Sequence, residues 1–291
     1  MPLPPRTTPV PKPVFVPGMS PVLTDSSSPV SPTPSSLPDS DHIPTRRKDA
    51  ASDKEGSSSK EDFSLPKLRL EIRDLNHPGA KCFLDAVNVS DCLAKCVRDV
   101  LRLLYVTPSD PFTTAPTTRS VTLILRDMEG VAYTTGTDLD NDHKEIHFSL
   151  GYIASIPKTR CTDEVSGVIT HELVHCYQYN GRGTCPGGLI EGIADWVRLN
   201  CELCPPHWKR EADGEWDGGY QKTAYFLEYL EQRFGAGTVR RLNEKLRTQK
   251  YGEKEFWTGL LGRPVEQLWE DYRDKLKDDE AVFVNKEDIS S

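Results

Sequence analysis

Two histidines and a glutamate are the residues of this chain whose types and spacing best suit chemistry. They lie in the run His171-Glu172-Leu173-Val174-His175. Because a helix turns once in ~3.6 residues, side chains four apart share one face, and two imidazoles can then bind one metal ion together. Glu172 follows the first histidine and can accept a proton from water beside the metal. The pattern predicts a zinc-dependent hydrolase.

The residues around this pattern have the periodicity of an amphipathic helix. Asp163 and Glu164 suit the first turn, where negative charge favours the helix dipole. The Asn180-Gly181 pair predicts the end of the helix in a left-handed residue. Burying Glu172 without a partner would be costly, which favours a metal site over a purely structural helix. Apolar residues recur at helical spacing: Val165, Val168, Ile169, Leu173, Val174 and Tyr177.

A third metal ligand is expected from a second helix. Gly187-Gly188 forms a break, and the pattern predicts a helix from Gly188 to Leu199. Glu191 and Asp195 are four apart and share a face of it. A catalytic zinc takes three protein ligands and leaves one position open. We assign Glu191 as the third ligand and Asp195 as the carboxylate that orients a ligand imidazole, with the reverse assignment open.

The remaining elements predict an α+β fold in which a small mixed sheet packs against the metal-binding helix pair and the C-terminal part is mostly helical. We expect a disordered Pro/Ser-rich tail at residues 1–63, which hold more than half of the 23 prolines. A folded domain at 64–277 and a charged, flexible C-terminus at 278–291 follow. We predict strands at Lys67–Arg73, Val121–Leu125 and Glu145–Ser149. A helix capped by Ser90 is expected between the first two strands. Further helices are predicted near Tyr220–Phe234, Thr238–Arg247, Glu253–Leu260 and Pro264–Leu276.

Composition excludes some classes of function. The net charge of −8 and the pI near 5.5 do not suit a nucleic-acid surface. No apolar run approaches the ~20 residues needed to span a bilayer, and no signal peptide is readable, so we expect an intracellular protein. We also expect a monomer. In that compartment the eight cysteines are expected to be free thiols.

Two long motifs carry a resemblance to a known family. They run from His171 to Gly181 and from Pro186 to Leu199, and shorter matches lie at 126–133, 145–147, 216–220, 223–227 and 267–272. Together they closely resemble the plant basic secretory protein family, zincin-like proteins also found in fungi and bacteria. The resemblance covers about residues 66–277 and implies a zincin-like metallopeptidase fold acting on peptides or proteins. Because family members are often extracellular, secretion is the alternative localisation. The acidic charge and the long tail depart from the plant members.

The expected reaction is peptide hydrolysis at one Zn²⁺ ion held by His171, His175 and Glu191. Glu172 takes a proton from water and returns it to the leaving amine. Tyr220, in a Gly-rich turn after the two helices that carry the ligands, is the candidate for stabilising the oxyanion, and a structural role as a core or hydrogen-bonded tyrosine is the alternative. Extended substrate is expected to add to the edge of the strand that contains Ile146, His147 and Phe148, with His147 in a structural role.

The competing interpretation is a non-catalytic binding or defence module that keeps the zincin fold around a structural metal. The intact Glu172 argues against it, because a purely structural site has no need of a base there.

Overall fold

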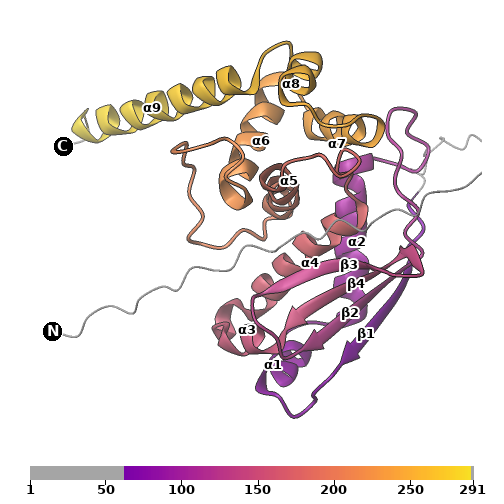
Figure 1. Ribbon diagram of the computed structural model, residues 1–291. Helices are drawn as coiled ribbons and strands as arrows, with labels where there is room; N and C mark the ends of the chain where they lie inside the picture. The colour runs from indigo at the N-terminus through magenta and orange to yellow at the C-terminus, as the bar shows by residue number, and fades with distance from the viewer. Residues whose placement is uncertain (1–61, 290–291) are drawn as a thin grey trace, which may run out of the picture. The chain divides into compact units, whose positions relative to one another are not determined.

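The computed structural model describes residues 62–289, with side chains as far as residue 279, and has an α+β fold (Figure 1). Most of the predicted N-terminal tail therefore lies outside the described residues. The described residues form the following elements in chain order: β1 (Lys67–Ile72), α1 (Pro78–Ala86), α2 (Val89–Tyr105), β2 (Ser120–Arg126), β3 (Ala132–Thr137), β4 (Asp140–Ser149), α3 (Leu150–Ser155), the short 3₁₀ helix η1 (Lys158–Arg160), α4 (Cys161–Tyr177), α5 (Gly187–Asn200), α6 (Tyr220–Phe234), α7 (Thr238–Thr248), α8 (Glu253–Leu261) and α9 (Val265–Ile289).

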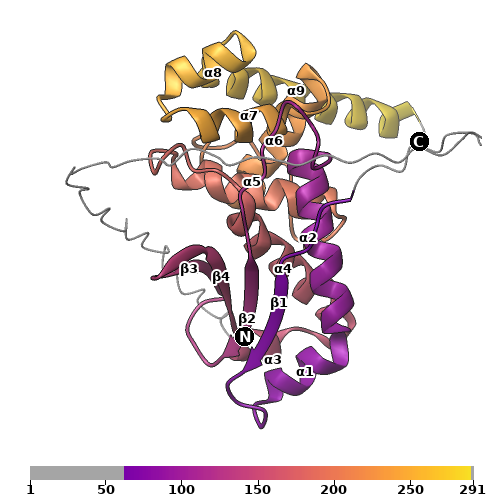
Figure 2. The same cartoon turned by 90° about the vertical axis from the view of Figure 1, so that its right-hand side faces the viewer.

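A small mixed sheet has the strand order β1-β2-β4-β3. β1, β2 and β4 run parallel, and β3 pairs antiparallel with β4. Leu123, Ile146 and Phe148 of the sheet are fully buried. Helices α2 and α4 pack against one face of the sheet (Figure 2). The sheet thus supplies one wall against which α4, the helix that carries His171 and His175, packs.

The position of β4 corrects one prediction. The strand with Ile146 and Phe148 was expected to offer an edge to substrate, but β4 lies between β2 and β3, which occupy both of its edges. Ile146 and Phe148 are buried, and His147 stacks on Tyr133 with ring centroids 4.6 Å apart. The edge strand on this side of the sheet is β3, which was not among the strands predicted from the sequence.

Helix α4 ends earlier than predicted. It stops at Tyr177, and Gln178 is already extended, so the left-handed Gly181 belongs to the following turn. Tertiary hydrogen bonds replace the missing turn: the Tyr105 hydroxyl donates to the Tyr177 carbonyl, and the Tyr179 amide donates to Asn243 Oδ1 over 2.9 Å. Contacts with α2 and α7 therefore determine where the helix ends.

Other boundaries differ in smaller ways. Asn88 rather than Ser90 caps α2, because the Asn88 side chain accepts from the Asp91 amide. The predicted helices near 220–234, 238–247 and 253–260 match α6, α7 and α8 closely. Helix α9 continues to Ile289, so most of the C-terminal segment that was expected to fray is helical.

Candidate metal centre

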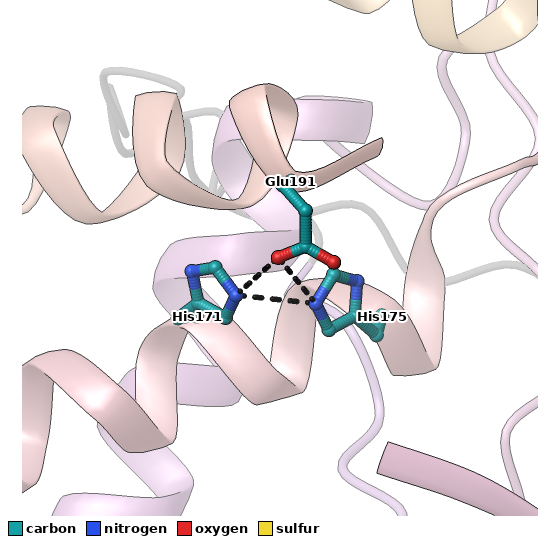
Figure 3. Close-up of side chains that lie close together, drawn as sticks. All are labelled: His171, His175 and Glu191. Atoms are coloured by element: carbon teal, nitrogen blue, oxygen red, sulfur yellow. Dashed lines mark hydrogen bonds and ion pairs between the residues drawn. The ribbon is translucent and has the colours of Figure 1, made fainter. Parts of the chain in front are cut away.

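Two neighbouring helices bring three metal-ligating side chains together (Figure 3). His171 and His175 come from α4, and Glu191 comes from the first half of α5. The Nε2 atoms of the two histidines are 3.2 Å apart. Glu191 Oε2 lies 3.0 Å from His171 Nε2 and 3.7 Å from His175 Nε2. One carboxylate oxygen and two imidazole nitrogens therefore surround a common point.

The separations of these three donors fit a tetrahedral metal ion. Ligands at the ~2.0–2.1 Å of zinc–nitrogen and zinc–oxygen bonds stand about 3.3 Å apart on a tetrahedron. Within residues 62–279, this is the group of His, Cys, Asp and Glu side chains whose donors lie close enough to hold one ion. The set could bind a metal ion.

Asp195 lies on the other side of the His171 ring. Its Oδ1 is 2.7 Å from His171 Nδ1, and its side chain is 3% exposed, one helical turn after Glu191. Glu191 faces both Nε2 atoms and Asp195 reaches only an Nδ1 atom, so the geometry favours Glu191 as the ligand and Asp195 as the orienting carboxylate.

The charge around His171 and His175 pushes their pKa values in opposite directions. Burial opposes protonation of His171, but the charge of Asp195 and hydrogen bonds to Asp195 and Glu191 outweigh it and raise the His171 pKa to about 10. Burial, followed by the charge on His171, lowers the pKa of His175. Without a metal ion, one proton is therefore held on His171 between the carboxylates, and His175 stays neutral.

Gln178 takes the corresponding position beside His175. Its side-chain amide lies 2.6 Å from His175 Nδ1, while its Oε1 is buried with no hydrogen-bond partner among the described residues. A histidine that binds metal through Nε2 carries its proton on Nδ1 and needs an acceptor there. A half-turn of the amide supplies Oε1 as that acceptor, because the two ends of the amide have the same shape.

Thr134 of β3 fixes the glutamate of the motif. Its hydroxyl lies 2.7 Å from Glu172 Oε2 and 2.9 Å from the Glu172 carbonyl oxygen. Glu172 itself is 5% exposed. The edge strand therefore orients the carboxylate that stands next to the histidine pair.

Two glycines explain how close α5 comes to its neighbours. A Cβ at Gly188 would lie 1.7 Å from the Asp217 carbonyl oxygen, and one at Gly192 would lie 2.2 Å from the Thr223 side chain. Only glycine permits such approaches. The start of α5 thus packs against the turn that leads into α6, and this packing sets the position of Glu191.

Tyr220 follows that turn and lies beside the metal-ligating group. Its φ angle of 47° is in the left-handed region, which a non-glycine residue rarely adopts. Its ring is nearly parallel to that of His171, with centroids 6.2 Å apart, and it remains 49% exposed. Burial, followed by the charges of Glu191, Asp195 and Glu172, raises the Tyr220 pKa to about 12, so its hydroxyl remains a donor at neutral pH.

A buried ion pair joins α4 to α5 far from the histidines. Arg198 Nη2 lies 3.1 Å from Glu164 Oε1, which also accepts a hydrogen bond from the Tyr152 hydroxyl. The Arg198 guanidinium fills the space beside Gly167, where a Cβ would lie 2.6 Å from Arg198 Nε. This pair and the metal-ligating group lie at opposite ends of the helix pair.

Comparison with known proteins adds the family. The family model BSP, described as a peptidase of plants and bacteria, matches residues 65–272. The chain belongs to this peptidase family. The matched range contains every residue of the site described above, from Thr134 to Tyr220. Among curated proteins and solved structures, none shows a significant match.

Two residues that contact the candidate site, Gln178 and Thr134, were not predicted from the sequence. Gln178 lies three positions after His175, and its closeness in the sequence was the available signal, although Gln178 itself is outside the helix. Thr134 precedes Glu172 by 38 positions, and nothing in its local sequence separates it from other strand threonines.

No helix in the described part of the chain is long and apolar enough to cross a membrane.

Proposed function

We propose that this protein is a zinc-dependent peptidase with a zincin-like fold. The observation that carries the proposal is the group of three donors at tetrahedral separations, with the Glu172 carboxylate on the next residue of the same helix. The donor set of two imidazoles and one carboxylate is one that suits catalytic zinc. The description of the family as a peptidase supports the reaction class.

His171, His175 and Glu191 would hold the ion. When bound, zinc polarises the scissile carbonyl and makes water acidic enough to lose a proton near neutral pH. Asp195 and Gln178 hold the two imidazoles so that both Nε2 atoms face the same point.

Glu172 acts as the general base. Its carboxylate takes a proton from the attacking water and carries it to the leaving amine. The Thr134 hydroxyl keeps the carboxylate in place while the proton moves. Tyr220, beside His171 and protonated at neutral pH, donates a hydrogen bond to the oxyanion that forms from the carbonyl.

Strand β3 binds the substrate in an extended conformation. It is an edge strand, and among the described strands it pairs with β4 alone. A peptide that pairs with its free backbone groups would lie alongside Thr134 and Glu172. Such binding through the main chain suits a peptidase that accepts varied side chains.

The test compares wild type with Glu172→Gln on an unfolded, casein-like protein, at equal zinc content determined by metal analysis. We expect the variant to bind zinc normally and to lose about 10²- to 10⁴-fold in kcat, because a positioned general base contributes that much. Glu129→Gln, an exposed glutamate after β2, serves as the matched control and should retain wild-type activity. Equal cleavage by wild type and Glu172→Gln, or zinc-loaded wild type that cuts no peptide in a broad library, would contradict the proposal.

A further inference from the structure

Two cysteines from distant parts of the chain meet at the start of the metal helix. Cys82 lies in α1, and Cys161 is the first residue of α4. Their Sγ atoms are 2.9 Å apart, although 79 positions separate them in the sequence. Both are free thiols in this structure.

We propose that Cys82 and Cys161 are a site of reversible disulfide formation that ties α1 to the first turn of α4. A disulfide requires its sulfur atoms at about 2.05 Å. The present separation is close enough that small side-chain rotations bring them to that distance. The backbones are already held together, because the Thr162 hydroxyl donates to the Ala86 carbonyl over 2.9 Å.

The local structure gives this bond a role. Helix α4 begins after Arg160, and among the described residues no side chain caps its first amides. The same helix carries His171, Glu172 and His175, so fraying of its first turn would loosen the element that presents them. A covalent link at Cys161 fixes that turn to α1, which is itself packed so tightly on α3 that a Cβ at Gly79 would lie 2.1 Å from the Leu150 carbonyl oxygen.

The two thiols are suited to different steps of thiol–disulfide exchange. Cys82 is partly exposed, whereas Cys161 is 5% exposed. Burial, followed by its hydrogen bond to Cys82, raises the Cys161 pKa to about 12, so this sulfur remains a thiol at neutral pH. A small oxidant therefore meets Cys82 first.

With a low-molecular-weight disulfide such as oxidised glutathione as the oxidant, the reaction has two steps. The Cys82 thiol loses its proton to water, and the thiolate attacks one sulfur of the small disulfide. The S–S bond of the small disulfide breaks as the mixed disulfide forms, and the released small thiolate takes up a proton from water. Cys161 then loses its proton to water and attacks the Cys82 sulfur, which releases the second small thiol. Two protein thiols and one small disulfide become one protein disulfide and two small thiols.

The pair Cys92 and Cys96 allows a comparison between thiol reactivity and thiol geometry within the same chain. Cys92 and Cys96 lie one helical turn apart in α2, and hydrogen bonding to Cys96, opposed by burial, lowers the Cys92 pKa to about 7. Cys92 is therefore the more reactive thiol towards alkylating agents, but its sulfur contacts Ser166 of α4, not a cysteine from another element. Reactivity alone predicts oxidation at Cys92, while geometry predicts it at Cys82 and Cys161.

The experiment equilibrates the full chain in oxidised glutathione or in dithiothreitol, alkylates the remaining thiols and maps the peptides under non-reducing conditions. We expect one linked peptide pair that joins Cys82 to Cys161, about 2 Da lighter than the reduced pair, because two hydrogens are lost. The oxidised protein should melt on the order of 10 °C higher than the reduced protein, since the closed loop is long.

Variants separate the site from general thiol oxidation. Cys82→Ser should abolish both the linked peptide and the difference in Tm, whereas Cys92→Ser should keep both. The proposal would be overturned if oxidised wild type contained no Cys82–Cys161 peptide, or if Cys82 and Cys161 were linked to other cysteines instead. Equal Tm values for the oxidised and the reduced protein would also overturn it. Because peptide mapping uses wild type, it decides the question even if the Cys82→Ser variant folds poorly.

Discussion

The hydroxyl of Thr134 lies 2.7 Å from Glu172 Oε2 and thereby joins the edge strand β3 to the metal helix α4. A hydrogen bond to a charged group contributes ~1.5–3 kcal/mol, which corresponds to about 10- to 100-fold in rate if it acts in the transition state. We therefore expect Thr134→Val, which keeps the shape of the side chain, to lower kcat by about that factor on a protein substrate.

Thr135→Val is the matched control for this prediction. Thr135 is the next residue of β3, is exposed, and donates to the carbonyl of Gly136 instead of to Glu172. Steady-state kinetics at equal zinc content should show wild-type kcat for it. An equal loss in both variants would mean that the strand, and not the hydroxyl, matters.

Asp195→Asn should weaken metal binding. The buried carboxylate holds His171 through Nδ1, and loss of such a partner reduces metal affinity about 10- to 100-fold. Competition with a chromophoric chelator measures the change. Asp163→Asn, in the exposed first turn of the same helix, should leave the affinity unchanged. Unaltered affinity in Asp195→Asn would contradict the orienting role.

Gln178 should support His175 as a hydrogen-bond acceptor. We expect Gln178→Glu to retain metal, because a carboxylate oxygen can accept the proton on Nδ1, and Gln178→Met to lose about tenfold in affinity, because it offers no such oxygen. The rate at which a chelator removes the ion distinguishes the two variants. Equal rates for Gln178→Met and wild type would exclude this contact from the site.

Tyr220→Phe should reduce turnover with little effect on KM. Removal of one oxyanion donor costs about 10²- to 10³-fold in kcat, whereas ground-state binding does not use that donor. Tyr225→Phe is the control. Tyr225 lies on the following turn of α6 and contacts Trp208 instead of the metal-ligating group, so this variant should behave as wild type. A rise in KM without a fall in kcat would assign Tyr220 to substrate binding instead.

Metal uptake by the metal-free protein should release a proton and strengthen with pH. His171 is protonated below its raised pKa of about 10, and a metal ion competes with that proton. The pKa of His175 is lowered, so this residue is already neutral at pH 7 and contributes no proton. Affinity should therefore rise about tenfold per pH unit between pH 7 and 9.

Titration calorimetry in buffers of different ionisation enthalpy measures this release. About one proton per metal ion is expected at pH 7.5 from the competition at His171. Binding that releases no proton, with affinity independent of pH, would contradict the charge arrangement around His171.

Local patterns in the sequence predicted the helix pair and the residues that gather in the metal-ligating group. Periodicity places His171 and His175 on one face, and the same rule pairs Glu191 with Asp195. Which side chains share a helix face depends only on spacing within one or two helical turns, whereas the meeting of His171 with Glu191 is a contact between two helices.

Long-range pairing was beyond such patterns. The strand that holds Ile146 and Phe148 was wrongly expected at an edge, because alternation reveals which face is buried but not which strands lie on either side. The role of Thr134 depends on the same pairing. The end of α4 was placed at Asn180-Gly181, whereas contacts with Tyr105 and Asn243 stop the helix at Tyr177.

That end of α4 limits how far the protein can be shortened. Asn243 of α7 donates to the Tyr105 hydroxyl over 3.0 Å and accepts from the Tyr179 amide, so α2 and α7 meet at the turn after His175. A fragment covering only residues 132–225 would contain every side chain of the metal centre and yet lack both supports. The smallest piece able to present the histidines in this geometry must therefore reach from α2 to α7, which is most of the family region.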